Sequence, residues 1–429
     1  MRLSGDSIKD ITGGAWDCEF AYLYQRDTEK QKSRYINALY SFEQIFGTDR
    51  EVCLISAPGR TELGGNHTDH QFGRVLAAAV TMDILAVAAK RSDGIIHVHS
   101  QGFKPETVDI KNTEKKHEEI NTSAALIRGV AAGFLENGYL AGGFDAYAVS
   151  DIPAGSGLSS SAAFEVLIGA ILNKLYNGGS VGSLKIAQIG QYAENVYFGK
   201  PCGLMDQTAS SVGGIVSIDF KSPSMPAVQK IDYNFSRAKH TLIITDAGGS
   251  HADLSDEYAS IPAEMKSVAA YFSKQALREV DGSLLYENIS ALRSRVTDRA
   301  VLRAIHFFDE NDRVEKQIES LKNSDMETFK KLMISSGFSS MANLQNCYPS
   351  GNTAERSVSL ALSLSERILN GMGAWRIHGG GFAGTILSLV PDEIVNEYIS
   401  GMESAFKKGC CHKLIVRPEG AYVMEGDNG

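Results

Sequence analysis

The sequence feature that most constrains the fold is a glycine- and serine-rich loop that leads directly into an apolar helix. The loop, Pro-Ala-Gly-Ser-Gly-Leu-Ser-Ser-Ser, occupies residues 153–161. Apolar side chains then recur at helical spacing from Ala162 to Leu175, and Gly178 and Gly179 end the pattern. Unpaired N–H groups in the first turn of such a helix, and the helix dipole, favour an anion, and glycine allows close approach. The sequence therefore predicts a phosphate-binding loop, with a merely serine-capped helix as the alternative.

This loop is not one of two common nucleotide-binding motifs. No Gly-Lys-Ser/Thr follows the glycines, so it is not a Walker A loop, and the chain has no GxGxxG dinucleotide fingerprint. The three serines, residues 159–161, provide hydroxyl donors or one oxygen ligand for Mg²⁺.

A second polar stretch covers residues 57–70. We expect a short strand at 52–55, broken by Pro58 and Gly59, and then a glycine-rich loop from residue 59 to residue 73. An arginine, an amide, two imidazoles and a carboxylate lie within residues 60–70, and such donors and acceptors suit a polyhydroxylated sugar. A solvated loop is one alternative. A metal site through His67, Asp69 and His70 is another, although the spacing matches no metal-ligand signature.

A third stretch, residues 376–385, has four glycines within residues 379–384, between two predicted strands. So many glycines need a backbone reason, such as positive φ angles or the close approach of another group. A tight hairpin turn is the alternative.

Length and charge limit the classes of protein that fit. A chain of 429 residues predicts two domains, and 43% hydrophobic with 22% charged residues is typical of a soluble globular protein. The net charge is −9 and no long basic run occurs, so we expect no nucleic-acid partner.

The sequence also predicts a cytoplasmic protein. Residues 1–14 lack the pattern of a signal peptide, and the longest apolar stretch, residues 75–89, is shorter than the ~20 residues that span a membrane. The six cysteines show no CxxC spacing, so we expect free thiols and neither a zinc site nor disulfides. We further expect a monomer.

Hydrophobic periodicity predicts mixed helices and strands, an α+β protein. A helix should end near Gly47, and strands are expected at 75–80, 84–88, 95–98, 146–149, 213–220 and 241–245. Helices are expected at 124–134 and 184–198. The second half should alternate helices at 263–278, 297–308, 313–335 and 353–371 with strands at 375–378, 385–389 and 413–417.

In this order, the three polar stretches resemble the three signature motifs of the GHMP small-molecule kinases. Residues 59–69 are similar to the galactokinase signature, and Pro201-Cys-Gly-Leu-Met-Asp-Gln207 resembles the galactokinase segment that holds a catalytic aspartate. The resemblance implies a two-domain α+β fold: a helical extension at 1–34, an N-terminal domain with a mixed sheet like that of ribosomal protein S5 at 35–230, and a ferredoxin-like C-terminal domain at 231–429.

The resemblance also implies a reaction and roles for individual residues. The expected reaction transfers the γ-phosphate of ATP to the anomeric hydroxyl of galactose, giving galactose 1-phosphate and ADP. Asp206 is expected to act as base or electrostatic partner, with Arg60 paired to it, and Ser161 and Glu194 are expected to hold Mg²⁺. The residues expected to bind ATP are Gly155, Ser156, Gly157, Leu158, Ser159, Ser160 and Ser161. Those expected to bind the sugar are Asn66, His67, Thr68, Asp69, Gly203 and Tyr258.

Three of these roles have simpler alternatives. Glu194 could be an exposed charge on its helix, Asp206 could cap the segment that follows it, and Tyr258 could be an ordinary core or surface aromatic.

The chain departs from the galactokinase pattern at five signature positions. Asn66 stands where the family has a carboxylate, Glu62 where it has asparagine and His70 where it has tyrosine. Gly64 replaces isoleucine, and His378 replaces threonine. These departures keep two alternatives open: a 1-kinase for a related sugar such as galacturonate or N-acetylgalactosamine, and a non-catalytic galactose and ATP sensor.

Overall fold

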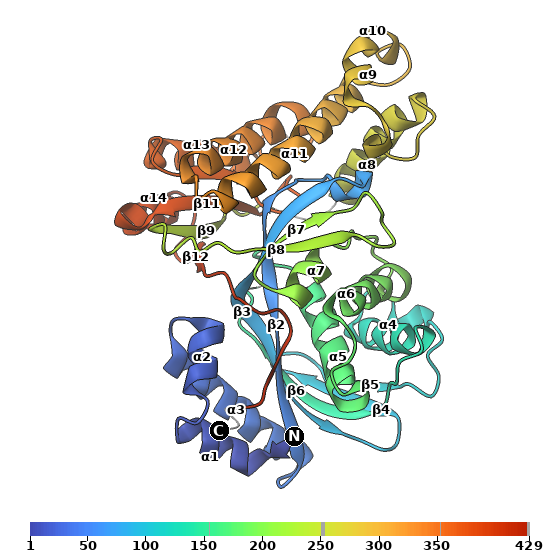
Figure 1. Cartoon of the computed structure of the whole chain (residues 1–429), viewed down its shortest axis with the longest axis vertical. Helices are drawn as coiled ribbons and strands as arrows, with labels where there is room; N and C mark the ends of the chain where they lie inside the picture. Colours follow the sequence, from blue (N-terminus) through green and yellow to red (C-terminus); the bar gives the residue numbers. More distant parts are fainter. Residues whose placement is uncertain (154, 250–253, 352, 427–429) are drawn as a thin grey trace.

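The computed structural model describes residues 1–153, 155–249, 254–351 and 353–426. Ala154 of the glycine-rich loop lies outside them, as do 250–253, 352 and 427–429 of the predicted C-terminal domain. The chain forms two sheets with helices packed against them (Figure 1). The α+β prediction is therefore confirmed.

The first sheet is mixed. Its central path runs, in spatial order, through β1 (Arg2–Leu3), β2 (Glu51–Gly64), β3 (Arg74–Lys90), β6 (Phe144–Ser150), β4 (Ile95–Ser100) and β5 (Glu106–Asp109). Off this path, β13 (Tyr422–Met424) pairs with β2, β7 (Ile215–Asp219) with β3 and β8 (Ala227–Ile231) with β7. Strands β4 and β6 are parallel, and the other pairs are antiparallel.

The two longest strands differ from the prediction. Strand β2 continues through Pro58 and Gly59 instead of ending there, and β3 is one strand of 17 residues where two were expected. The β2–β3 register shifts between the pairs Pro58↔Asp83 and Arg60↔Ala79, which marks a bulge. A bulge tolerates proline because the ladder is already interrupted there.

Helices cover both faces of the first sheet (Figure 1). On one face, Leu54, Leu85 and Val87 pack against the N-terminal helices α1 (Ser4–Thr12), α2 (Asp17–Tyr24) and α3 (Thr28–Phe46). On the other face, the alternate strand residues pack against α4 (Ser123–Glu136), α5 (Ser160–Asn177) and α6 (Ser183–Tyr192). Both faces of β2 and β3 are therefore buried, as the nearly unbroken apolar runs of these strands indicate.

Several predicted helices are confirmed. Helix α3 ends at Gly47, whose φ is 93°, and α5 ends at Gly178. Helix α6 continues into a π-helical turn, Ala193–Phe198, and α7 (Met205–Val212) follows.

The second sheet has the order β10 (Ala374–Ile377), β11 (Thr385–Pro391), β9 (His240–Asp246) and β12 (Cys411–Leu414), all antiparallel. The main helices of this half are α8 (Ser255–Tyr271), α11 (Asp298–Lys322), α12 (Met326–Ser339), α13 (Ser357–Leu369) and α14 (Val395–Ala405); α9 (Gly282–Glu287) and α10 (Ile289–Leu292) are short. Helix α11 runs through residues 309–312, where a break was expected. The domain limits at residues 34 and 230 stay predictions.

A buried ion cluster joins the N-terminal helices to the first sheet and to the end of the chain. Asp83 of β3 is fully buried, and its carboxylate accepts hydrogen bonds from Arg34 of α3, Arg417 and Tyr24, at 2.6, 2.6 and 2.7 Å. Burial alone would raise the pKa of Asp83, but Arg34 and Arg417 outweigh it and hold the pKa below its usual value. Asp83, which interrupts an apolar run of the sequence, is therefore a point of attachment for two distant segments.

We predict that Asp83→Asn lowers the free energy of unfolding by about 3–5 kcal/mol, because two buried guanidinium groups lose their counter-charge. Urea unfolding measures this. The matched control is Asp298→Asn, which breaks an exposed ion pair with Arg293 and should leave unfolding close to wild type.

The pH dependence of the free energy of unfolding gives a second test of Asp83→Asn. A carboxylate whose pKa is lowered by folding stabilises the native state above its unfolded pKa, and this contribution is lost as the pH falls through the folded pKa. The gap in stability between wild type and Asp83→Asn should therefore narrow only below about pH 4. An equal stability of the two proteins at pH 7 would contradict the assignment.

Candidate active site

The site centres on an ion pair between β2 and α7. Arg60 donates two hydrogen bonds of 2.6 Å to the Asp206 carboxylate, from Nε to Oδ1 and from Nη2 to Oδ2. Ser159 also donates to that carboxylate. Burial would raise the pKa of Asp206, but the Arg60 guanidinium outweighs it and holds the pKa below its usual value. Asp206 is therefore ionised at neutral pH, and it faces Arg60 instead of capping a helix.

The glycine-rich loop lies against this pair. Arg60 donates through Nη1 to the carbonyl of Gly157 at 2.5 Å and through its backbone N–H to the carbonyl of Leu158 at 3.0 Å. Ser159 occupies the N-cap of α5 with a φ of 61°, and its side chain makes no capping hydrogen bond. The alternative of a serine-capped helix is thus wrong at this position, and Ser159 leaves the first-turn N–H groups of α5 available to an anion.

The third glycine cluster packs on the glycine-rich loop. A Cβ atom at Gly157 would lie 2.8 Å from Thr385 Oγ1 and 2.9 Å from His378 Nδ1, so the two segments are in direct contact. Burial lowers the pKa of His378 well below its usual value, with Arg60 and Arg376 adding to the effect. A neutral ring fits its bonds: one nitrogen accepts from the Glu62 N–H at 3.4 Å, and the other donates to Thr385 Oγ1 at 3.2 Å.

Ser161 and Glu194, the two residues expected to hold Mg²⁺, lie next to each other. Ser161 Oγ donates to Glu194 Oε1 at 3.5 Å. Glu194 lies in the π-helical turn and is 3% exposed, so the alternative of an exposed surface charge is wrong. Its other oxygen accepts from Gln207 Nε2 at 2.9 Å, and the same amide donates to Glu165 at 2.9 Å.

These oxygen donors fit a magnesium ion that is completed by phosphate oxygens and water, because Mg²⁺ usually takes only one or two protein carboxylates. In the described part of the chain, no group of three or more His, Cys, Asp or Glu side chains could hold a metal alone.

The second polar stretch provides side chains with free hydrogen-bonding capacity. His67 donates through Nε2 to the carbonyl of Gly380 at 3.0 Å, while its buried Nδ1 has no partner among the described residues. Burial, with help from His70, lowers the pKa of His67 to about 4. A neutral His67 can therefore accept a hydrogen bond from a ligand at Nδ1.

Asp69 lies directly against Gly203. Its Oδ1 accepts the backbone N–H of His70 at 2.9 Å, and its Oδ2 lies 1.9 Å from where a Cβ of residue 203 would be. Only glycine leaves room for the carboxylate here. Thr68 serves its own loop instead, because its hydroxyl hydrogen-bonds the carbonyls of Gly65 and Arg74 at 2.9 and 2.6 Å.

Asn66 is 1% exposed, and its amide is held inside the protein. It donates to the carbonyl of Gly379 at 2.7 Å and to Glu62 Oε1 at 3.2 Å, and its oxygen accepts from Asn346 at 2.8 Å. Glu62 in turn accepts from Arg376 at 2.6 Å. Burial raises the pKa of Glu62, while Arg376 opposes the shift.

Tyr258 packs on the same glycine cluster. Its hydroxyl donates to the carbonyl of Gly381 at 2.9 Å, and its ring lies 2.5 Å from where a Cβ of Gly380 would be. The cluster therefore brings Tyr258 close to His67 and Asn66.

Sequence reasoning missed the helix face that supports these loops. On α11, His306 hydrogen-bonds the Asn66 carbonyl at 3.0 Å, and Glu310 accepts the Gly65 N–H at 3.0 Å. Burial would raise the pKa of Glu310, but Arg313 and Arg376 outweigh it and hold the pKa at about 2. In the sequence, these residues are only polar residues at helical spacing within an amphipathic helix. Such residues are usually exposed, so nothing indicated that they are buried against the loops.

Comparisons with known proteins agree with this geometry. The family described as GHMP kinases N terminal domain matches residues 125–214, and the Galactokinase galactose-binding signature matches residues 40–90. The crystal structure of Lactococcus lactis galactokinase complexed with galactose superposes with a TM-score of 0.77 at 22% identity, covering 89% of this chain and 98% of that one. Together with the two-sheet fold, these matches define a GHMP kinase.

Relatives with higher sequence identity show which family of GHMP kinases the chain belongs to. The galactokinase of Glaesserella parasuis is 32% identical over 82% of this chain and 89% of its own length. That of Streptomyces coelicolor is 29% identical over 85% of this chain and 91% of its own. The chain belongs to the galactokinase family, and the resemblance seen in the three motifs is confirmed. Membership of a kinase family implies ATP as a substrate.

We predict that Gly203→Ala lowers kcat/KM for the sugar by about 10- to 100-fold, because a methyl group displaces the Asp69 carboxylate, and small displacements of binding groups have effects of this size. Steady-state kinetics measure the loss. The control is Gly5→Ala in α1, where no atom lies within 4 Å of the added Cβ. Unchanged sugar kinetics in Gly203→Ala would show that the Asp69 position does not matter.

Proposed function

We propose that this chain transfers the γ-phosphate of ATP to the anomeric hydroxyl of galactose, giving galactose 1-phosphate and ADP. The observation that carries the proposal is the two-bond ion pair of Arg60 and Asp206 beside the glycine-rich loop. Residues 155–161 surround the phosphates in this proposal. Asp69, His67, Gly203 and Tyr258 surround the sugar.

The pair suits a phosphoryl transfer with a loose transition state. The hydroxyl oxygen forms a bond to the γ-phosphorus as the bond to the leaving oxygen of ADP breaks, and the hydroxyl proton passes to Asp206 Oδ. Such a transition state needs little help from a strong base, so a carboxylate with a lowered pKa is sufficient to orient the hydroxyl and accept its proton. Arg60 offsets the negative charge gathered at Asp206 and the phosphates.

Ser161 and Glu194 would hold Mg²⁺ in this proposal, and the ion would neutralise phosphate charge. Gln207 donates a hydrogen bond of 2.9 Å to the buried Glu194 and so positions its carboxylate. A monomeric and cytoplasmic enzyme is also part of the proposal, and both points rest on the sequence alone.

We predict that Asp206→Asn lowers kcat by about 10²–10⁴-fold, the range typical of a lost acid–base group, while sugar binding persists. A coupled assay of ADP release measures turnover, and calorimetry with galactose measures binding. The matched control is Asp309→Asn, at an exposed position on α11, which should behave as wild type. Wild-type turnover in Asp206→Asn would refute the proposed mechanism, and no turnover in the unmodified protein would instead favour the sensor alternative.

A second candidate is a 1-kinase for galacturonate or N-acetylgalactosamine. It is favoured by the exchange at residues 62 and 66, which removes a carboxylate from the position where the family has one. Each polar atom of the Asn66 amide has a partner in the protein, so residue 66 presents no negative charge to the sugar. A panel of galactose, galacturonate, N-acetylgalactosamine, arabinose and glucose with ATP and Mg²⁺ distinguishes the two candidates.

The exchange itself can be tested by reversing it. Asn66→Glu alone puts a carboxylate beside the Gly379 carbonyl and Glu62, so we expect kcat/KM to fall by at least about tenfold with every sugar. Adding Glu62→Asn removes the repulsion, and the double variant should recover activity toward galactose. The control is Glu62→Asn alone, which removes the carboxylate 2.6 Å from Arg376 and leaves it the longer ion pair with Glu310 at 3.9 Å. If the double variant is no better than Asn66→Glu, the two positions are not coupled.

A further inference from the structure

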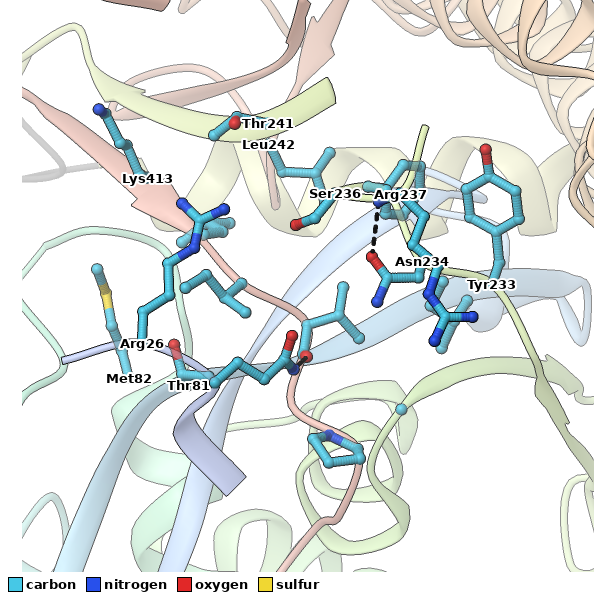
Figure 2. A pocket seen from close by; sticks show the side chains of 18 of the residues that line it. Arg26, Thr81, Met82, Tyr233, Asn234, Ser236, Arg237, Thr241, Leu242 and Lys413 are labelled. Carbon is cyan, nitrogen blue, oxygen red and sulfur yellow. Dashed lines mark hydrogen bonds between the residues drawn. The ribbon is translucent and has the colours of Figure 1, made fainter. Parts of the chain in front are cut away.

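A cavity of about 640 Å³ lies away from the catalytic pair (Figure 2). Its walls come from the segment between α2 and α3, the bulged part of β3, residues 230–242 and residues 413–418. Its lining includes none of the residues proposed above for catalysis, sugar binding or phosphate binding. The volume is in the range of small-molecule sites.

The lining is cationic although the chain is acidic. Five lysines and arginines and three aspartates are among the described residues that line the cavity, whereas the whole chain has a net charge of −9. One of the aspartates, Asp151, is already held by Gln31 at 3.2 Å and by Arg34 at 3.3 Å. The lining cations therefore outnumber the anions available to them.

Four of the cations have no acidic partner in the described part of the chain. Within the described residues, no carboxylate lies within 4.0 Å of a side-chain nitrogen of Arg26, Lys30, Arg237 or Lys413; Lys230 pairs with Glu419 at 3.5 Å. Figure 2 shows Arg26 and Lys413 on one side of the cavity and Arg237 on the other. Cations from separate chain segments that converge without counter-charges repel one another, and a bound anion would relieve this repulsion.

An imidazole and two aromatic rings complete the lining. The imidazole of His240 donates a hydrogen bond of 2.7 Å through Nδ1 to the carbonyl of Ala238. Its Nε2 is buried and has no hydrogen-bond partner in the described structure. Tyr233 and Phe235 contribute aromatic rings that pack edge to face at 5.1 Å. A ligand larger than a bare ion thus has both polar and apolar surface to contact.

From these observations we infer that the cavity is a second binding site, for a small phosphorylated metabolite. Arginine and lysine bind phosphate oxygens through charge-assisted hydrogen bonds, and the rings accommodate the carbon skeleton of the metabolite. Arg26 and Lys30 precede residue 40, where the match to the galactose-binding signature begins. The site therefore depends on a segment outside that signature.

A bound metabolite would link the N-terminal helices to both sheets. Gln25 already donates to the carbonyl of Val416 at 2.7 Å, next to the cavity. A ligand that binds only the native state stabilises it by mass action, so the melting temperature should rise with ligand concentration.

The test is calorimetric titration of the full chain with inorganic phosphate, pyrophosphate and glucose 1,6-bisphosphate at low ionic strength. Saturating ADP is present throughout, so that the glycine-rich loop is occupied. We expect glucose 1,6-bisphosphate to bind, and we expect its affinity to fall at least about tenfold in Arg26→Ala/Lys413→Ala, because each charge-assisted hydrogen bond contributes about that much. The melting temperature should rise with the ligand in wild type and much less in the variant.

The matched control is Lys104→Ala/Lys266→Ala, which removes two exposed lysines outside the cavity. It should bind as wild type does. Arg26 and Lys413 are exposed, and normal unfolding of the cavity variant would show that it is folded. The proposal is overturned if none of the three probes binds wild type, if only inorganic phosphate binds, or if the cavity variant binds as tightly as the control.

Discussion

The break in the β2–β3 ladder at Pro58 and Gly59, opposite the extra residues of β3, is the constraint on which the geometry of the site depends. Ser210 of α7 donates to the Pro58 carbonyl at 2.7 Å, and the next residue but one, Arg60, donates its backbone N–H to Leu158 of the glycine-rich loop. A Cβ at Gly59 would lie 2.9 Å from the Leu158 carbonyl, so the loop approaches as closely as glycine permits. Two segments from distant parts of the sequence, α7 and the glycine-rich loop, are therefore fixed at one point of β2. With these contacts in place, the Arg60 guanidinium lies against both Asp206 and Gly157. The same backbone irregularity therefore positions both the ion pair and the glycine-rich loop.

Helix α11 fixes the other half of the site. Its residues 306, 310, 313 and 317 share one face, because they recur at helical spacing. Through them the helix contacts the backbone from Leu63 to Asn66, and Gln317 lies where a side chain at Gly64 would be. Buried polar groups are costly unless they are paired. Here His306, Glu310 and Gln317 hydrogen-bond the backbone of the signature loop. Arg313 pairs with Glu310, while Gln317 Oε1 has no hydrogen-bond partner among the described residues. The loop thus gains a fixed conformation from a helix about 240 residues further along the chain.

Patterns within short sequence windows predicted those helices, helix ends and strands that depend on nearby residues alone. The helix after the glycine-rich loop, the end of α3 at Gly47 and the alternation of helices and strands in the second half each follow from periodicity and glycine within a short window. The lengths of β2 and β3 could not be predicted in this way. Pro58, Gly59 and Asp83 look like interruptions of a strand until their partners in the fold are known. Within the site, the motifs identified the residues that meet at Arg60 and Asp206. They could not identify Glu310, Arg376 or Asn346, since nothing local distinguishes a buried polar residue from an exposed one.

Three of the five departures from the galactokinase pattern, at residues 62, 66 and 378, form a connected set in space. Where the family has an amide at 62 and a carboxylate at 66, this chain has the reverse, and the two side chains still share a hydrogen bond of 3.2 Å. The exchange moves one negative charge along β2 into contact with Arg376. His378 fits the same rearrangement, because its ring accepts the backbone N–H of Glu62 while contacting the glycine-rich loop. A change of charge at residue 66 is thus compensated by groups on the second sheet. In the proposed function, residue 66 lies at the sugar end of the site and takes no part in the hydrogen bonds between Arg60 and Asp206.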